Sequence, residues 1–509
     1  MTASPESHKV EALAGYLKDC LQAERLTVES FSRLSGGAIQ DNFGITVVCR
    51  GGPNEGRHAL VVRSDAPSKV AVSMSRAQEF RVLQVAHEAG VTVPRPFWCC
   101  EDASVIGAPF CVMARVNGSA SPRELVRQMG ANPAQARELV MQLGSELARI
   151  HSVVPDSPAA QRLHFLPMPS DKPALARVAE YRAALDAIPL PQPVLEWALN
   201  WLAQHAVDSG LRTLCHGDFR TGNYMVEDGR VTAVLDWEFA SWGDPYEDLG
   251  WLCARSWRFG AAERAVGGIG DRDDLYAAWE AGTGHTVDDR QVRYWEVMGM
   301  VRWAVIALQQ GQRHLSGEQP SLELALTGRM LPEIELDILA TVAQFEGQPI
   351  SAVALQPWHA PQGEASHAGA GLLAPDAGNT LQIARQTLLG TLLPQLPESC
   401  TYEALMVANA MAAAQRELAD GGRSHAGVKQ AVRAFLQGAQ MWQDSHSASD
   451  PRAVLARSLR AGRVPPTQDG ALRSLLILDT CTRLALTNPK YLAGHQESAR
   501  ALSTTESGE

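Results

Sequence analysis

The sequence lacks the features that mark membrane-spanning proteins, basic nucleic-acid-binding proteins and disulfide scaffolds. Its 509 residues contain no run of about 18 uncharged apolar residues, the length that a membrane-spanning helix needs. Lys and Arg number 45 against 56 Asp and Glu, so the net charge is −11 and no overall attraction to nucleic acid or anionic lipid is expected. The nine cysteines include no Cys-x-x-Cys spacing, and their odd number predicts a reduced protein of the cytoplasm.

Two further motifs are absent. No Gly-x4-Gly-Lys-Ser/Thr loop occurs, which argues against a P-loop nucleotide-binding enzyme. Residues 1–20 mix charged side chains with short apolar steps, so no signal peptide is expected.

The residues that are present divide the chain into regions of different texture. Residues 1–116 are rich in β-prone runs, among them 43–49, 58–63 and 110–113, with one helix, and residues 117–345 are mostly helical. Residues 346–379 are rich in Gly, Pro, Ala and Ser and indicate a linker. Residues 380–500 have apolar residues at helical spacing and predict a small all-α bundle. The apolar stripes of that bundle are Leu381, Ala384, Leu388 and Leu392; Tyr402, Leu405, Met406 and Ala413; Val428, Val432 and Phe435; and Leu472, Leu475 and Leu476.

One segment of the helical region predicts a β-hairpin that contains candidate metal-binding residues. Asp228-Gly229 lies between two β-prone runs and favours a two-residue turn, because both turn positions need a positive φ. With this turn, Asn223 should face Val234 across the hairpin, and Asp236 should lie diagonally on the same face as Asn223. An amide oxygen and a carboxylate in this arrangement can share one Mg²⁺ ion.

Asp218 lies five residues before Asn223, on the loop that enters the hairpin. It can therefore lie close to the same metal ion without binding it. Phosphoryl transfer needs this arrangement, with two oxygen ligands for Mg²⁺ and a separate carboxylate that orients the attacking hydroxyl. The alternative is that Asp and Asn occupy this stretch only because they favour turns. The combination of His-Gly-Asp-x4-Asn with a hairpin and a terminal Asp favours function over that alternative.

Three neighbouring residues are assigned to positioning roles. Asp244-Pro245-Tyr246-Glu247 predicts the start of a helix, so Asp244 and Asp248 are expected to belong to the scaffold. His216 is expected to orient the loop through hydrogen bonds and need not titrate during a reaction.

The pattern from His216 through Asn223 to Asp236 resembles the active-site signature of the aminoglycoside phosphotransferase and choline kinase family, which is related to protein kinases. The stretch from Glu101 to Met113 is similar to the kinase-like domains linked to acyl-CoA dehydrogenases. The resemblance covers about residues 25–340. It implies an α+β, bilobal protein-kinase-like fold, with residues 1–116 as a β-rich N-lobe and 117–345 as a mainly helical C-lobe. It also implies that Asp218 is the catalytic base and that Asn223 and Asp236 bind Mg²⁺. Residues 380–500 resemble a domain of unknown function.

The same resemblance suggests where a nucleotide would bind. Gly36 and Gly37, between two predicted strands, could bring backbone amides close to phosphate. Arg63 occupies the place where kinases usually carry a phosphate-binding Lys, and its expected partner is Glu79, at the edge of an apolar helical stripe with Val82, Leu83 and Ala86. The run from Phe110 through Met113 to Arg115 corresponds to the interlobe hinge, whose backbone would bind a purine.

The resulting hypothesis is an ATP- and Mg²⁺-dependent enzyme that phosphorylates a hydroxyl group of a small molecule. The alternative is a catalytically silent pseudokinase that binds nucleotide as a sensor or scaffold, since Arg63 replaces the usual Lys and a helical domain follows. The acceptor stays open among aminoglycosides, choline-like amines, sugars and hydroxyacyl-CoA thioesters, as does the choice between ATP and GTP. No nucleic-acid or membrane partner is expected, whereas residues 380–500 could mediate a homo-oligomer or bind a protein partner.

Overall fold

The computed structural model describes residues 5–34, 40–65, 74–359, 376–443, 446 and 448–506. Two compact units follow from the internal contacts. The first comprises residues 1–173 and 208–296, and the second comprises residues 174–207 and 297–509. Within the described ranges, no helix is both long enough and apolar enough to span a membrane.

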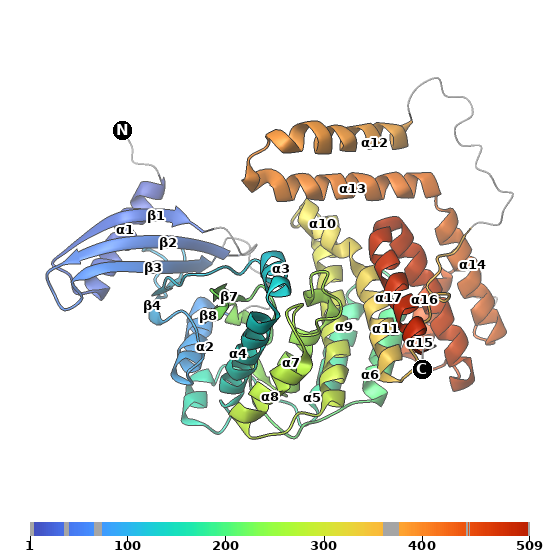
Figure 1. Ribbon diagram of the computed structural model, residues 1–509, viewed down its shortest axis with the longest axis horizontal. Helices are drawn as coiled ribbons and strands as arrows, with labels where there is room; N and C mark the ends of the chain where they lie inside the picture. Colours follow the sequence, from blue (N-terminus) through green and yellow to red (C-terminus); the bar gives the residue numbers. More distant parts are fainter. Residues whose placement is uncertain are drawn as a thin grey trace. The chain divides into compact units, whose positions relative to one another are not determined.

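The first unit begins with a five-stranded antiparallel sheet, drawn in blue in Figure 1. The strands follow the order β1-β2-β3-β5-β4, with β4 at one edge. The strands predicted at 43–49, 58–63 and 110–113 are confirmed and lie within β2, β3 and β5. The bounds are Arg25–Arg33 for β1, Gln40–Arg50 for β2, Gly56–Asp65 for β3, Pro96–Cys100 for β4 and Phe110–Ala114 for β5.

The two faces of this sheet pack against different helices. Val62, Val112 and Cys100 point into an apolar core that α1 (Pro5–Cys20) closes with its leucines. Because side chains alternate along a strand, their neighbours Arg63, Cys111 and Cys99 point to the other face. Helix α2 (Arg76–Glu88) contacts β4 and β5 on that side, and its predicted stripe from Glu79 to Ala86 is buried. One face of the sheet is therefore apolar, and the other face carries the side chains of Arg63, Cys99 and Cys111.

The rest of the first unit is mainly helical and contains two short strand pairs. Strand β6 (Thr213–Cys215) pairs with β9 (Ser241–Gly243), and β7 (Tyr224–Glu227) pairs with β8 (Arg230–Val234). The helices are α3 (Pro122–Ala131), α4 (Pro133–His151), α7 (Tyr246–Cys253), α8 (Arg272–Thr283) and the first part of α9 (Asp289–Leu315). The predicted α+β class, with a β-rich part followed by a mainly helical part, is confirmed.

The predicted hairpin is present, but its register differs from the prediction. Asp228 and Gly229 form the turn with φ of 50° and 75°, and Glu227 pairs with Arg230. Val226 then pairs with Val231, whereas Met225 pairs with Ala233, so Thr232 is an extra residue in β8. This bulge places Tyr224, and not Asn223, opposite Val234. The predicted pairing of Asn223 with Val234 is wrong for that reason, and the diagonal, same-face placement of Asp236 that was derived from it does not hold in this register.

The second unit is entirely helical in its described part. Helix α6 packs against α15, where Arg460 Nε and Glu196 Oε2 lie 2.6 Å apart, and α11 packs against α16. The bounds are Pro173–Asp186 for α5, Pro193–Gln204 for α6, Leu322–Arg329 for α10, Leu331–Phe345 for α11, Ala377–Thr387 for α12, Thr401–Asp420 for α13, Arg423–Gly438 for α14, Pro451–Arg460 for α15, Asp469–Thr487 for α16 and Pro489–Glu506 for α17.

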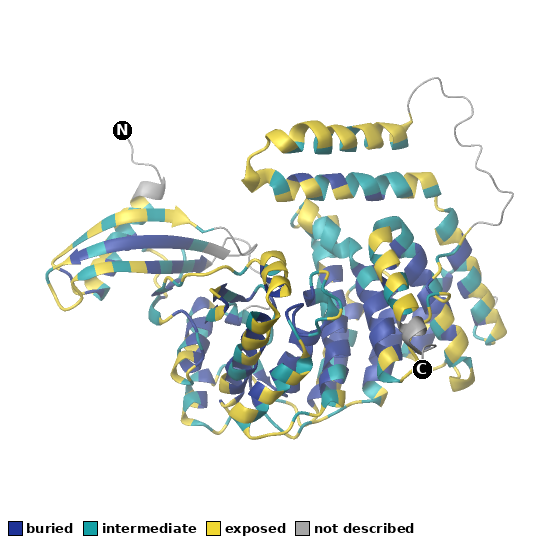
Figure 2. Ribbon diagram, in the orientation of Figure 1, coloured by how far each residue is buried: buried dark blue, intermediate teal, exposed yellow. Residues whose placement is uncertain are grey.

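Some apolar stripes of the C-terminal helices form a core and others do not. Val428, Val432, Leu472, Leu475 and Leu476 are buried as predicted. In contrast, Ala413 is the only buried member of the two predicted stripes at 381–392 and 402–413, and Figure 2 shows α12 without a buried face. Exposed members of these stripes are Leu392, Tyr402 and Leu405. Helical spacing alone therefore did not identify which stripes meet a partner helix.

The domain boundaries predicted from the sequence are 1–116, 117–345, 346–379 and 380–500. They stay a prediction, because each compact unit is defined by contacts and combines two separate segments of the chain. Residues 360–375, which are 16 of the 34 residues of the predicted linker, lie outside the described residues.

Candidate active site

The loop from His216 to Asn223 connects β6 to β7 and contains Asp218, whose carboxylate is held by hydrogen bonds. Asp218 Oδ2 accepts a hydrogen bond from Asn223 Nδ2 at 2.5 Å. Asp218 Oδ1 accepts hydrogen bonds from Trp251 Nε1 at 2.9 Å and from Arg220 Nε at 3.3 Å. The Asp218 side chain keeps 14% of its surface exposed. Three donors thus fix the orientation of the carboxylate while leaving it accessible.

His216 links this loop to the end of the hairpin. Its Nδ1 accepts a hydrogen bond from the backbone N–H of Asp218 at 3.1 Å, so the neutral ring carries its proton on Nε2. That nitrogen lies 2.8 Å from the carbonyl oxygen of Leu235, the residue before Asp236. Burial lowers the pKa of His216 and keeps the ring neutral. The predicted orienting role of His216 is confirmed by these two hydrogen bonds.

Asp248 on α7 anchors the start of the loop. Its side chain is fully buried, and its two oxygens accept the backbone N–H groups of His216 at 2.7 Å and Gly217 at 2.9 Å. His151 Nε2 lies 3.2 Å from the same carboxylate. Burial alone would raise the pKa of Asp248, but the hydrogen bonds from His151 and the His216 N–H outweigh it and lower that pKa. Asp248 is therefore a positioning residue, in agreement with its assignment to the scaffold.

His151, Cys215 and Asp248 lie within 4.8 Å of one another and have the residue types of a metal site. Two observations oppose that role. Trp279 Nε1 donates to His151 Nδ1 at 2.9 Å, so the proton of the neutral ring is on Nε2, the atom that faces Asp248. A protonated nitrogen cannot bind a metal, and both oxygens of Asp248 already accept backbone hydrogen bonds.

Asp236 follows β8 in a left-handed backbone conformation with φ of 61°. Its Oδ1 lies 2.7 Å from Arg63, and 44% of the side chain is exposed. The backbone N–H of the preceding Leu235 donates to the carbonyl oxygen of Asn223 at 2.8 Å, which joins the two segments. The amide nitrogen of Asn223 is engaged by Asp218, so its oxygen is the atom available to a cation. An amide oxygen and a carboxylate oxygen are suitable donors for a hard divalent cation.

Arg63 on β3 connects Asp236 to α2. Its guanidinium lies 3.0 Å from Glu79 Oε1, which confirms the predicted ion pair, and Arg76 pairs with the other oxygen of Glu79. Burial opposes the charge on Arg63, but the carboxylates of Glu79 and Asp236 outweigh burial and raise the pKa of Arg63. Arg63 therefore stays positively charged in a buried place.

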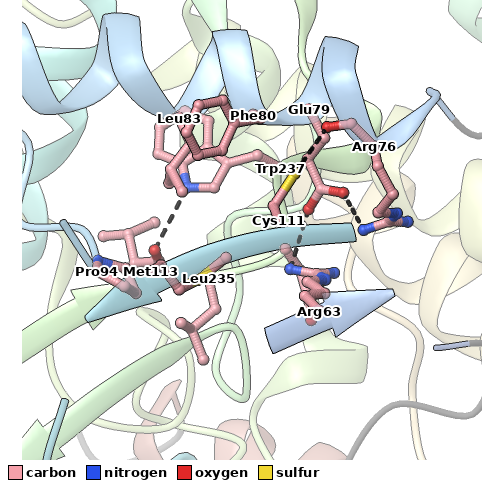
Figure 3. A pocket seen from close by; sticks show the side chains of 12 residues that line it. Arg63, Arg76, Glu79, Phe80, Leu83, Pro94, Cys111, Met113, Leu235 and Trp237 are labelled. Atoms are coloured by element: carbon pink, nitrogen blue, oxygen red, sulfur yellow. Dashed lines mark hydrogen bonds and ion pairs between the residues drawn. The ribbon is translucent and has the colours of Figure 1, made fainter. Parts of the chain in front are cut away.

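A cavity lies beside these charges, with α2, β5 and the end of the hairpin around it (Figure 3). Phe80, Leu83 and Met113 supply apolar surface, while Arg63 and Asp236 supply charge. A mainly apolar cavity with a few charged groups is typical of small-molecule sites. Its other lining residues are Arg76, Glu79, Pro94, Cys111, Val234, Leu235 and Trp237.

The structure brings together most of the residues predicted for the site. Arg63, Glu79, Met113 and Asp236 line the cavity, and Asp218 and Asn223 contact each other. Arg115 is exposed, and its guanidinium lies near Gly44 on β2, so its side chain is not among the groups lining the cavity. Gly36 and Gly37 lie outside the described residues.

Three residues near the site were not predicted from the sequence. Arg76 could have been found, because it lies three residues before Glu79 on the same helix. Trp251 has no local signal, since its contact with Asp218 spans 33 residues. Glu238 lies near Asp236, and burial together with Glu79 and Asp236 raises its pKa.

Comparisons with known proteins show which families and folds the chain is similar to. The model of a family described as "Phosphotransferase enzyme family" matches residues 30–285, and one described as a domain of unknown function (DUF6285) matches residues 394–491. A Ralstonia eutropha protein that its description assigns to the aminoglycoside phosphotransferases has a similar structure, with a TM-score of 0.52 and 23% identity over 67% of this chain and 99% of its own. This similarity confirms the kinase-like fold.

The curated relatives carry the name of another enzyme class. The chain is 33% identical to acyl-CoA dehydrogenase family member 10 of Mus musculus over 249 residues, which are 48% of this chain and 22% of the relative. It is 30% identical to family member 11 of Homo sapiens over 251 residues, 48% of this chain and 30% of that protein. The chain thus matches less than a third of the length of these relatives, in agreement with the resemblance to their kinase-like domains.

Proposed function

The chain belongs to the phosphotransferase enzyme family, and we propose that it transfers the γ-phosphoryl group of ATP to a hydroxyl group of a small molecule. The observation that carries this proposal is that hydrogen bonds join the segments of Asp218, Asn223 and Asp236. Asn223 donates to Asp218, and both His216 and Asn223 bind the backbone of Leu235, the residue before Asp236.

Asp218 is the residue suited to act on the acceptor. Its carboxylate is held by Trp251, Arg220 and Asn223 and remains accessible. In the proposed reaction it orients the acceptor hydroxyl and takes its proton as the oxygen bonds to the γ-phosphorus and ADP leaves. Fixing the carboxylate beforehand lowers the entropy cost of reaching the reactive geometry.

Asn223 and Asp236 are the residues that would hold Mg²⁺. Both offer oxygen atoms, and the exposed side chain of Asp236 lies where a nucleotide phosphate could approach from the cavity. When bound, Mg²⁺ neutralises phosphate charge and orients the transferred group. Arg63, already paired with Asp236, adds a positive charge beside the same place.

The cavity between α2, β5 and the hairpin would take the nucleotide base and sugar. Its apolar surface from Phe80, Leu83 and Met113 suits the faces of a purine, and Arg63 marks the end at which phosphates would lie. The nucleotide would thus extend from Met113 toward Asp236.

The surroundings of Asp218 favour an acceptor without positive charge. Arg220 contacts Asp218 and stacks its guanidinium 4.7 Å from the ring of Trp257, so a fixed cation lies beside the proposed base. A polycationic acceptor would be repelled by that charge. Because the curated relatives are named for acyl-CoA chemistry, a hydroxyacyl thioester of coenzyme A is the first candidate among neutral and anionic acceptors.

The test is phosphate transfer from γ-labelled ATP with Mg²⁺ to a panel of hydroxyacyl-CoA thioesters, sugars, choline-like amines and aminoglycosides. We expect a labelled product that disappears in Asp218→Asn, with anionic or neutral acceptors preferred. Asp228→Asn in the exposed hairpin turn is the matched control and should keep the activity. Binding of Mg²⁺-ATP without a labelled product from any acceptor would contradict the proposal and favour the pseudokinase alternative.

A further inference from the structure

Two cysteines face each other across the edge of the sheet. Cys99 on β4 is the direct partner of Cys111 on β5, and their Sγ atoms lie 3.0 Å apart. Both thiols are free. Directly opposed residues of antiparallel strands have Cα atoms about 4.5–5.5 Å apart, within the range of 4.4–6.8 Å that disulfides span. The backbone therefore needs little movement for these two sulfurs to bond.

The two cysteines and Arg63, the proposed phosphate-binding residue, are cross-strand neighbours in the sheet. Cys111 pairs with Cys99 on one side and with Arg63 of β3 on the other, so the three side chains share the face that α2 covers. Cys111 lines the cavity, as Figure 3 shows. Cys100, the next residue of β4, points to the opposite face and belongs to the apolar core. Oxidation of the pair would thus act beside the nucleotide cavity.

The two thiols have different environments. Cys99 is partly exposed on the edge strand, and the hydrogen bond from the Cys111 thiol lowers the pKa of Cys99. Cys111 is 4% exposed, and its hydrogen bond to Cys99 together with burial raises its own pKa. The thiolate is the reactive form of cysteine. Cys99 is therefore the thiol that reacts first, and Cys111 is placed to react second.

We propose that Cys99 and Cys111 form a reversible disulfide when the protein meets hydrogen peroxide. The Cys99 thiolate attacks one peroxide oxygen, the O–O bond breaks, and a sulfenic acid and one water form once the leaving hydroxide is protonated. The Cys111 sulfur then attacks the Cys99 sulfur, the S–O bond breaks, and the Cys111 proton leaves with the hydroxide as a second water. Two thiols are oxidised, the peroxide is reduced, and a dithiol reductant reverses the change.

The disulfide would alter the cavity wall. In the reduced protein the Cys111 sulfur lies 3.4 Å from the carbonyl oxygen of Arg76, and Arg76 pairs with Glu79, which pairs with Arg63. The disulfide has no S–H to donate and draws Cys111 Sγ toward Cys99. We expect weaker ATP binding by the oxidised protein, and this consequence, unlike the disulfide itself, rests on the proposed function.

The first experiment tests the disulfide. The full chain is treated with hydrogen peroxide, free thiols are alkylated, and the protein is digested with trypsin and a glutamate-specific protease. Trypsin alone would leave both cysteines in one peptide, because no Lys or Arg lies between Cys99 and Cys111, whereas cleavage after Glu101 separates them. We expect a cross-linked peptide pair lighter by two hydrogen atoms than the two free peptides together.

The mass of the cross-linked pair does not distinguish Cys99 from Cys100 as the partner of Cys111, because both lie in one peptide. Single variants therefore identify the partner. The cross-link should persist in Cys100→Ser and disappear in Cys99→Ser. The exposed, isolated Cys400 serves as the internal control for peroxide exposure. Oxidation of Cys400 without a cross-link in the wild-type chain would overturn the proposal, as would a cross-link that survives Cys99→Ser.

The second experiment measures ATP binding by calorimetry before and after oxidation. We expect the Kd for Mg²⁺-ATP to rise by about twofold to tenfold on oxidation and to recover with dithiothreitol, while Cys99→Ser stays unresponsive. A disulfide that leaves the Kd unchanged would contradict the effect on the cavity. If neither form binds ATP, the proposed function fails, whereas the peptide map still decides whether the disulfide forms.

Discussion

Replacing Asp248 by Asn should release the loop that carries Asp218. In the wild-type chain, the two oxygens of Asp248 accept separate backbone N–H groups, from His216 at 2.7 Å and Gly217 at 2.9 Å, with no solvent contact. Asn offers one oxygen and one NH2 group, so one backbone N–H would face a donor. A buried N–H without an acceptor costs about 1–3 kcal/mol, and the loss of charge from the remaining bonds adds to this cost.

We therefore expect Asp248→Asn to lose about 2–4 kcal/mol of stability. For a unit of this size, the loss corresponds to a fall in melting temperature of roughly 5 to 15 °C. Asp228→Asn is the matched control, because Asp228 is exposed in a turn with φ of 50°, a conformation that Asn accepts readily. Thermal unfolding and hydrogen exchange of the 216–218 amides measure the two effects.

The same prediction has a pH dependence. The pKa of Asp248 is lower in the folded protein than its ordinary value, so its contribution to stability is present above that ordinary value and is lost as pH falls through the lowered pKa. Wild type should therefore lose its advantage over Asp248→Asn on acidification. An Asp248→Asn variant that melts within about 2 °C of Asp228→Asn and keeps the Gly217 amide protected would refute the reasoning.

Three further predictions concern other parts of the chain. Arg63→Ala should raise the Kd for Mg²⁺-ATP by about tenfold or more, measured by calorimetry, and Arg63→Lys should raise it less because the charge is kept. Gly217→Ala should lower the melting temperature, since φ is 76° and a Cβ atom would lie 2.2 Å from the carbonyl oxygen of Phe239. Burial raises the pKa of Glu333 to about 7, so stability should fall as pH rises from the ordinary carboxyl range to 7, and Glu333→Gln should melt higher than wild type at pH 8 but not at pH 5.

The parts of the site that local patterns determine were predicted from the sequence. The turn at Asp228-Gly229 has a strong local preference, and both residues have the positive φ that the prediction required. The ion pair of Arg63 with Glu79 followed from the resemblance to kinases and from the helical stripe that contains Glu79. In both cases neighbouring residues or a known motif carried the information.

The parts that depend on distant contacts were not predicted. The bulge at Thr232 shifts the hairpin by one residue, and its hydroxyl donates to the carbonyl oxygen of Asn117, which lies 115 residues away. Trp251 reaches Asp218 only because α7 packs beside the loop. The partner of Cys99 is Cys111 on the neighbouring strand, and not the adjacent Cys100, because side chains alternate across the sheet.

The apolar stripes of the C-terminal helices illustrate the same limit. The spacing of Tyr402 and Leu405 is as regular as that of Val428 and Val432, yet only the second pair is buried. Spacing specifies a helical face, whereas burial depends on whether another helix meets that face.

The most direct test of the proposed magnesium site is the Mg²⁺ dependence of ATP binding, measured by titration calorimetry with the ion present or chelated. Wild type should bind ATP more tightly with Mg²⁺, and Asp236→Asn should lose most of that difference, because it removes a charged oxygen ligand. Asp218→Asn should keep the difference, because Asp218 acts on the acceptor and not on the ion. An Asp236→Asn variant whose ATP affinity still depends on Mg²⁺ as strongly as that of wild type would contradict the account.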